Sequence, residues 1–185
     1  NALVKDLIAR HAIECDLTPG LLHAAWKRGD ANWLREEVEH LASAYAYTKM
    51  RYVPRDEMHM MVATERYHGG ILDEDGAHLH PLNYALGLAR AARKKGVRIY
   101  ENTRVLDITH TSPADVKTAQ GTVRAGHVVL ACNGYLGGLE QRVAGTIMPV
   151  NNFIVATEPL GDGAQKLIRD NVCVQDTKFV IDYYR

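Results

Sequence analysis

Apolar side chains recur at helical spacing in three stretches of the chain. Over residues 2–14 they lie along one face, and a second helix is expected after Asp30, where apolar residues fall at i, i+4, i+7, i+8 and i+11 from Leu34. Asp30 has the side chain of an N-cap. The third helix is expected to begin at Pro81, a residue favoured at the first helical position, and to end before Gly96. The pattern therefore predicts three amphipathic helices.

Two glycine-containing segments between these helices are typical of loops. Thr18-Pro19-Gly20 predicts a turn after the first helix. Residues 69–76 predict a loop, because they combine two adjacent glycines with a short acidic stretch.

Shorter apolar runs from residue 97 onward predict strands. Gly121 lies between two of them and predicts a hairpin, while the continuous run Val128–Cys132 is typical of a strand buried on both faces of a parallel sheet. A short helix is expected at 164–169. The predicted strands are residues 97–100, 104–108, 116–118, 122–124, 128–132, 153–156 and 179–184. The chain is therefore predicted to have a mixed α/β (α+β) fold, with the last two strands in a second sheet.

The composition narrows the class of partner. The 185 residues include 22 Lys and Arg against 22 Asp and Glu, so the formal net charge is zero. A nucleic acid or an anionic membrane surface needs concentrated Lys and Arg, and no stretch approaches the roughly 18 apolar residues of a membrane span. We therefore expect a cytoplasmic protein with a small-molecule partner and with no nucleic-acid or membrane partner. The sequence does not determine the oligomeric state.

The three cysteines, Cys15, Cys132 and Cys173, have no spacing typical of zinc sites or redox pairs. A reducing compartment fits this usage. Cys132 lies at the end of a predicted strand, where α/β folds often place function, but no basic residue is adjacent to activate the thiol. A small inert core residue is the simpler interpretation.

The histidines are the one candidate for a metal site. His78 and His80 alternate on an extended segment, near His68, Asp73 and Asp75. No third ligand stands at a distinctive spacing, and His80 directly precedes a helix start. We predict structural histidines and no bound metal. A metal-dependent hydrolase using His68, His78 and His80 stays open as an alternative.

Four long runs of sequence carry a resemblance to a known family. They are RYHGGILDEDG at 66–76, HLHPLNYALGLARAA at 78–92, VLACNGYLGGLE at 129–140 and FVIDYYR at 179–185. Through these runs the chain resembles the FAD-dependent amine oxidoreductases of the D-amino-acid-oxidase (DAO) type. Within that superfamily it is most similar to the gamma-glutamylputrescine oxidoreductases.

The resemblance implies a two-domain flavoenzyme whose cofactor is FAD. Such an enzyme oxidises the C–N bond of a small amine, here gamma-glutamylputrescine or a related compound. It implies that Tyr183 and Tyr184 face the flavin and contact the substrate. The residues implied to lie beside the cofactor are Val105, Ala131, Cys132, Asn133 and Gly134. It identifies no catalytic base and does not settle the electron acceptor.

The same resemblance divides the chain into three parts. Residues 1–66 are expected to form a helical segment and the start of the substrate-domain part. Residues 67–140 are expected to form part of a Rossmann-like FAD-binding domain, and residues 141–185 part of the substrate domain, which has a mixed or antiparallel sheet. The G-x-G-x-x-G turn with which the family holds the pyrophosphate does not occur in this sequence. We therefore expect a central fragment that is inactive alone and binds FAD weakly or not at all. A noncatalytic α/β binding domain stays open as an alternative.

Overall fold

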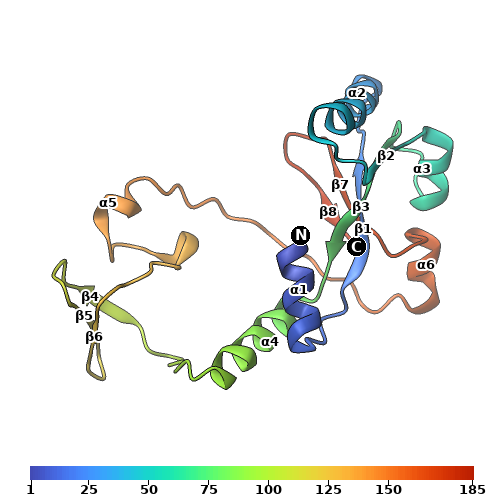
Figure 1. The fold of residues 1–185 in the computed structure, drawn as a ribbon. Helices are drawn as coiled ribbons and strands as arrows, with labels where there is room; N and C mark the ends of the chain where they lie inside the picture. Colours follow the sequence, from blue (N-terminus) through green and yellow to red (C-terminus); the bar gives the residue numbers. More distant parts are fainter. The chain divides into compact units, whose positions relative to one another are not determined.

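A computed structural model describes residues 1–185, which form two compact units. The first unit combines Asn1–Val97 with Thr157–Arg185, and the second is Arg98–Ala156. Figure 1 follows the elements of both units along the chain. These units do not test which segments belong to a cofactor or a substrate domain, so that division stays a prediction.

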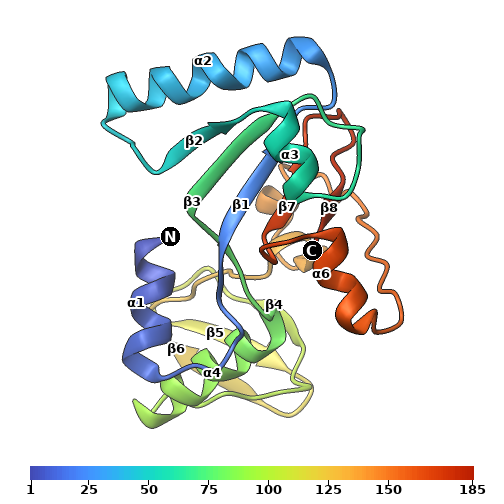
Figure 2. The same cartoon turned by 90° about the vertical axis from the view of Figure 1, so that its right-hand side faces the viewer.

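The first unit is built on a five-stranded sheet whose central strand is β1. Its strand order is β2-β3-β1-β7-β8, and Figure 2 shows these strands side by side. Strand β1 runs antiparallel to β3 and parallel to β7, with Leu22 paired to both Leu72 and Val174. The strands are β1 (Thr18–Ala24), β2 (Met50–Val53), β3 (Gly70–His78), β7 (Cys173–Asp176) and β8 (Tyr183–Tyr184). The sheet thus joins strands from the two ends of the chain.

Two helices, α2 and α3, cover opposite faces of this sheet. Successive strand residues point to opposite sides, so neighbouring residues of β3 contact different helices. Ile71 belongs to a buried cluster with Leu34 of α2, whereas its neighbour Leu72 packs against the cluster that contains Met58 of α3. Leu22 and Val174 are buried in the α3 cluster. The helices of this unit are α1 (Ala2–His11), α2 (Arg28–Tyr45), α3 (Arg55–Met61), α4 (Pro81–Lys94) and α6 (Ala164–Leu167), the last preceded by a 3₁₀ turn at Gly161–Gly163.

The expected helices are present, with differences at their ends and faces. Helix α2 begins at Arg28, so Asp30 is its third residue rather than its N-cap; the Asp30 carboxylate accepts the Lys27 backbone N–H at 3.1 Å. In α4 the predicted apolar face is open, with Leu82 60% exposed, and the buried residue is Gly87. A Cβ at Gly87 would lie 2.3 Å from the Ile13 side chain. Helix α4 therefore packs closely on Ile13 through this glycine, and not through the predicted apolar face. No helix of the chain combines the length and apolar character needed to cross a bilayer.

Two predicted loops are strands. Residues 18–20 begin β1 and residues 70–76 lie in β3. Pro19 is tolerated because the register shifts between Pro19 and Leu21, at an irregularity where a missing N–H costs little. Gly70 is required by close backbone approach, since a Cβ there would lie 2.1 Å from the His23 carbonyl oxygen. Pairing with distant strands therefore overrides the local turn signals.

The second unit is a three-stranded antiparallel sheet in the order β4-β5-β6. Its strands are β4 (Val105–Ile108), β5 (Ala114–Thr118) and β6 (Thr122–Ala125), followed by a 3₁₀ turn at Asn133–Tyr135 and helix α5 (Gln141–Ala144). The predicted hairpin is confirmed: Lys117 pairs with Thr122, and the Thr118 backbone N–H donates to the Gly121 carbonyl at 2.8 Å.

Four predicted strands are absent or shortened. Residues 97–100, 128–132 and 153–156 form no strand, and of 179–184 only Tyr183 and Tyr184 pair. Their side chains are exposed, with Val129 86% and Ile154 94% accessible. A strand must pair its backbone N–H and C=O groups with a neighbour, and within residues 1–185 these runs have none. An apolar run alone therefore does not make a strand.

Candidate functional site

One concave site of the first unit lies where α6 and the end of β8 meet. This cavity of about 710 Å³ is lined by Arg66, Tyr67, Asn171, Asp182, Tyr184 and Arg185, with apolar side chains that include Val62 and Ile168. We call it the tyrosine cavity. It brings together two phenols, two guanidinium groups and one carboxylate from two segments that are far apart in the sequence, residues 62–67 and 157–185.

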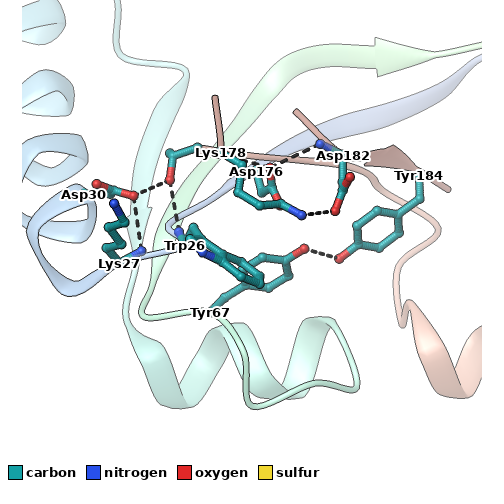
Figure 3. A network of polar contacts seen from close by, with 9 residues as sticks. Trp26, Lys27, Asp30, Tyr67, Asp176, Lys178, Asp182 and Tyr184 are labelled. Atoms are coloured by element: carbon teal, nitrogen blue, oxygen red, sulfur yellow. Dashed lines mark hydrogen bonds and ion pairs between the residues drawn. The ribbon is translucent and has the colours of Figure 1, made fainter. Parts of the chain in front are cut away.

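The two tyrosines form a hydrogen-bonded pair. Tyr184 Oη donates to Tyr67 Oη at 2.9 Å (Figure 3), and the Tyr67 ring meets Trp26 edge-on at 6.3 Å between centroids. Tyr67 is buried and Tyr184 is half-buried. Burial raises the pKa of both phenols, and the hydrogen bond it donates raises the pKa of Tyr184 further. Both side chains are therefore neutral hydroxyl groups across the physiological range.

The turn at residues 176–182, which precedes Tyr184, is held by the carboxylates of Asp176 and Asp182. The buried Asp176 carboxylate accepts the backbone N–H groups of Lys178 and Asp182, each at 3.2 Å. Lys178 Nζ forms an ion pair with Asp182 and lies 3.4 Å from the second Asp176 oxygen (Figure 3). The hydrogen bond to Asp182 raises the pKa of Lys178. This turn holds Asp182 at the cavity and leads the chain into β8.

Trp26 links this turn to the sheet. Lys178 Nζ lies 4.6 Å and Arg66 Cζ 4.8 Å from the Trp26 ring centroid, so the indole contacts two cations. The Trp26 backbone N–H donates to Thr177 Oγ1 at 3.0 Å, and Thr177 donates to the Asp30 carboxylate at 2.5 Å. The start of α2 and the end of β7 are thereby tied together beside the tyrosine cavity (Figure 3).

Arg185 is held at the same cavity by two groups of the first unit. Its Nη1 donates to the Leu79 carbonyl at 2.8 Å and lies 2.9 Å from His78 Nδ1. His78 Nε2 in turn lies 2.6 Å from the Asn171 carbonyl oxygen. With Arg66, this places two guanidinium groups on the lining, which suits a ligand that carries a carboxylate.

The second unit has a concave surface of its own. A groove of about 580 Å³, which we call the apolar groove, is lined by Val105 and Cys132 together with aliphatic side chains that include Val128, Leu130 and Leu136. Arg104 is the only charged side chain on its lining. Two of the five residues expected beside the cofactor thus meet at one surface.

The other three expected cofactor residues do not line the groove. Ala131 and Gly134 are exposed, and Asn133 begins the 3₁₀ turn, where its side chain accepts the Gly134 N–H at 2.8 Å. A Cβ at Gly134 would meet nothing within 4 Å. The backbone of this turn is therefore open to the approach of a ligand.

The groove fits part of FAD. Its aliphatic lining suits a flat ring system, and the Arg104 guanidinium suits a phosphate oxygen. Val105 and Cys132 are the residues that would contact the ring system. Nothing on the groove resembles the run of backbone N–H groups with which a glycine-rich turn holds a pyrophosphate.

The two tyrosines selected from the sequence have different surroundings. Tyr184 lines the tyrosine cavity, whereas Tyr183 pairs with Gln175, is 64% exposed and does not line it. Neighbouring strand residues point to opposite faces, so only one of the two can face the cavity. The sequence analysis did not select Tyr67 and Arg66, although both stand in the run at 66–76 that carries the family resemblance. Asp182 and Arg185 stand in the run at 179–185, but the sequence analysis assigned them no role.

The histidines of the alternative metal site do not converge. His80 Nδ1 accepts the Asn83 N–H at the start of α4, and His78 contacts Asn171 and Arg185. Within residues 1–185 no three His, Cys, Asp or Glu side chains come together in a way that could hold a metal ion. The geometry gives the hydrolase alternative no support.

The chain is similar to known proteins both in sequence and in fold. A family model described as DAO, FAD dependent oxidoreductase, matches residues 1–185. Gamma-glutamylputrescine oxidoreductase of Escherichia coli (strain K12) is 39% identical over 185 residues, covering 99% of this chain and 43% of that protein. A probable oxidoreductase, OrdL, of Rhizobium meliloti (strain 1021) is 35% identical over 176 residues, covering 95% of this chain and 41% of that protein. The chain therefore spans less than half the length of these relatives.

Solved structures show a similar fold. Glycine oxidase from Geobacillus kaustophilus matches with a TM-score of 0.64 and 26% identity, over 77% of this chain and 39% of that one. L-proline dehydrogenase from P. horikoshii matches over 98% of this chain and 49% of that one, with a TM-score of 0.73. Its identity is 17%, so this second likeness concerns the fold alone.

Proposed function

The chain belongs to the DAO family of FAD dependent oxidoreductases, and on that basis we propose that the protein oxidises the C–N bond of a small amine that carries an amino-acid group. Gamma-glutamylputrescine is the substrate we propose. The similarity to the Escherichia coli enzyme of that name supports the choice. So does the mixture of charges on the tyrosine cavity.

The single observation that carries the proposal is the cavity lining. Arg66 and Arg185 suit a carboxylate. Asp182 uses one oxygen for Lys178, which leaves the other to accept from an ammonium group. Gamma-glutamylputrescine has both groups at its glutamyl end, and the amine to be oxidised at the other. A simple diamine has no group for either arginine.

FAD, when bound, supplies the acceptor for the hydride that leaves the carbon next to the nitrogen. The part of this chain is to bind and orient. Val105 and Cys132 of the apolar groove would contact the cofactor, and the neutral hydroxyl of Tyr67, which accepts from Tyr184, keeps its own proton available to donate. The imine that leaves is hydrolysed by water. No residue of the chain is assigned as a catalytic base.

The test uses protein expressed from the complete coding sequence and reconstituted with FAD. We expect gamma-glutamylputrescine to bleach the flavin absorbance under anaerobic conditions far faster than putrescine, which lacks the glutamyl end. Arg185→Leu should raise the KM for gamma-glutamylputrescine, because a cavity guanidinium is lost. The matched control is Arg90→Leu, which removes an exposed arginine of α4. Equal rates with both amines, or no bleaching, would contradict the proposal.

We also propose that residues 1–185 alone are inactive and retain little FAD. The apolar groove offers one cation and no glycine-rich phosphate turn. The measurement is the flavin absorbance of the purified 185-residue chain after incubation with FAD and desalting. A flavin-to-protein ratio near one would refute this. We further propose a cytoplasmic location, where the free thiols of Cys15, Cys132 and Cys173 stay reduced.

A further inference from the structure

His78 links two segments that meet at the tyrosine cavity. It lies at the end of β3, half-buried, between Asn171 on one side and Arg185 on the other. Nε2 lies 2.6 Å from the Asn171 carbonyl oxygen, and Nδ1 lies 2.9 Å from Arg185 Nη1. Both Asn171 and Arg185 line the cavity, whereas His78 does not.

The chemistry of these neighbours sets the state of the ring. A carbonyl oxygen can only accept, so Nε2 carries the proton and donates to Asn171. A guanidinium can only donate, so Nδ1 is unprotonated and accepts from Arg185. The two contacts together therefore require neutral imidazole with the proton on Nε2. Both ring nitrogens are used, which also explains why His78 offers no metal ligand.

We propose that His78 is a positioning residue: it orients the Arg185 guanidinium toward the tyrosine cavity and so sets the affinity for the substrate carboxylate. This inference rests on the proposed function. An arginine side chain loses considerable rotamer freedom when it binds an anion. Because His78 and the Leu79 carbonyl already fix one nitrogen of Arg185, that cost is met before the substrate arrives.

Three substitutions separate the two contacts of the ring. His78→Asn places an amide oxygen near the position of Nδ1, so it can still accept from Arg185 but cannot reach Asn171. His78→Gln places an amide nitrogen near the position of Nε2, so it keeps the Asn171 contact and loses Arg185. His78→Leu loses both. A purely structural histidine would suffer about equally from losing either contact.

We expect His78→Asn to keep the KM for gamma-glutamylputrescine within about twofold of wild type. His78→Gln and His78→Leu should raise KM about tenfold, the effect of losing one charge-assisted hydrogen bond, with kcat within about twofold. The inference is overturned if His78→Asn raises KM as much as His78→Gln, or if no variant changes KM. A rise in KM accompanied by an equally large fall in kcat in all three variants would also overturn it.

A second measurement does not depend on turnover. The ¹⁵N resonances of the His78 ring at neutral pH should report the Nε2–H tautomer, and Arg185→Leu should shift the Nδ1 resonance, because its donor is gone. An Nδ1–H tautomer would overturn the inference. If wild-type protein fails to oxidise gamma-glutamylputrescine, the proposed function fails. The ring resonances still decide whether His78 holds Arg185.

Discussion

The hydrogen bond between Tyr67 and Tyr184 predicts a specific pattern of stabilities. The two hydroxyl oxygens are 2.9 Å apart, an ordinary length for a neutral pair, and Tyr67 is only 4% exposed. A net contribution of about 1 kcal/mol is expected for such a bond, and about 1–3 kcal/mol is lost when one buried partner is left unsatisfied. Tyr67→Phe leaves the Tyr184 proton without its acceptor, and Tyr184→Phe leaves the Tyr67 oxygen without its donor.

Each single substitution should therefore cost about 1–2 kcal/mol of unfolding free energy. The double variant should cost clearly less than the sum, because both hydroxyls are removed and the rings still pack. The coupling energy should be about 1 kcal/mol. The assay is urea unfolding of the FAD-free protein expressed from the complete coding sequence, followed by tyrosine and tryptophan fluorescence. Costs that add within about 0.3 kcal/mol would refute the reasoning.

Two further predictions concern the first unit. Gly70→Ala should destabilise it by several kcal/mol, about 3 or more, since the added Cβ would lie 2.1 Å from the His23 carbonyl oxygen; Gly29→Ala, in a helix with nothing within 4 Å, should be neutral or stabilise by up to about 1 kcal/mol. Equal melting temperatures for the two variants would contradict this. Burial and the hydrogen bond to Asp73 raise the pKa of Tyr47 to about 12. The unfolded chain ionises first, near pH 10, so stability from Tyr47 is complete below pH 10 and is lost as pH rises toward 12. Tyr47→Phe should flatten unfolding free energy against pH in that window, and an unchanged slope would contradict the assignment.

The elements that could be predicted are those whose information is local. Helices α2 and α4 follow from apolar periodicity, and the β5–β6 hairpin from a glycine between two short strands. Each forms its backbone hydrogen bonds within a short segment, so the residues that determine the structure are close together in the sequence. The predicted start of α2 was wrong, since Asp30 lies inside the helix and not at its N-cap.

The candidate site depended on the family resemblance in one part and on the tertiary structure in another. Tyr184 was selected from a motif, but the same motif named Tyr183, which is exposed on the other side of β8. A two-residue strand has no periodicity from which to choose a face. Only the pairing of β8 with β7 decides which tyrosine faces the cavity.

The apolar pattern was enough to predict a mixed α/β chain, and the resemblance carried by four long runs was enough to predict the DAO family, because both depend on short segments and on residue identity. The tertiary structure alone decided which segments became strands: Gly70–His78 did, despite its glycines and acids, and Val128–Cys132 did not, despite its apolar run. It alone brought Tyr67 to Tyr184 across 117 residues and His78 to Arg185 across 107. The reason is that a strand or a cavity is completed by partners distant in sequence, whose hydrogen bonds and burial no local pattern contains.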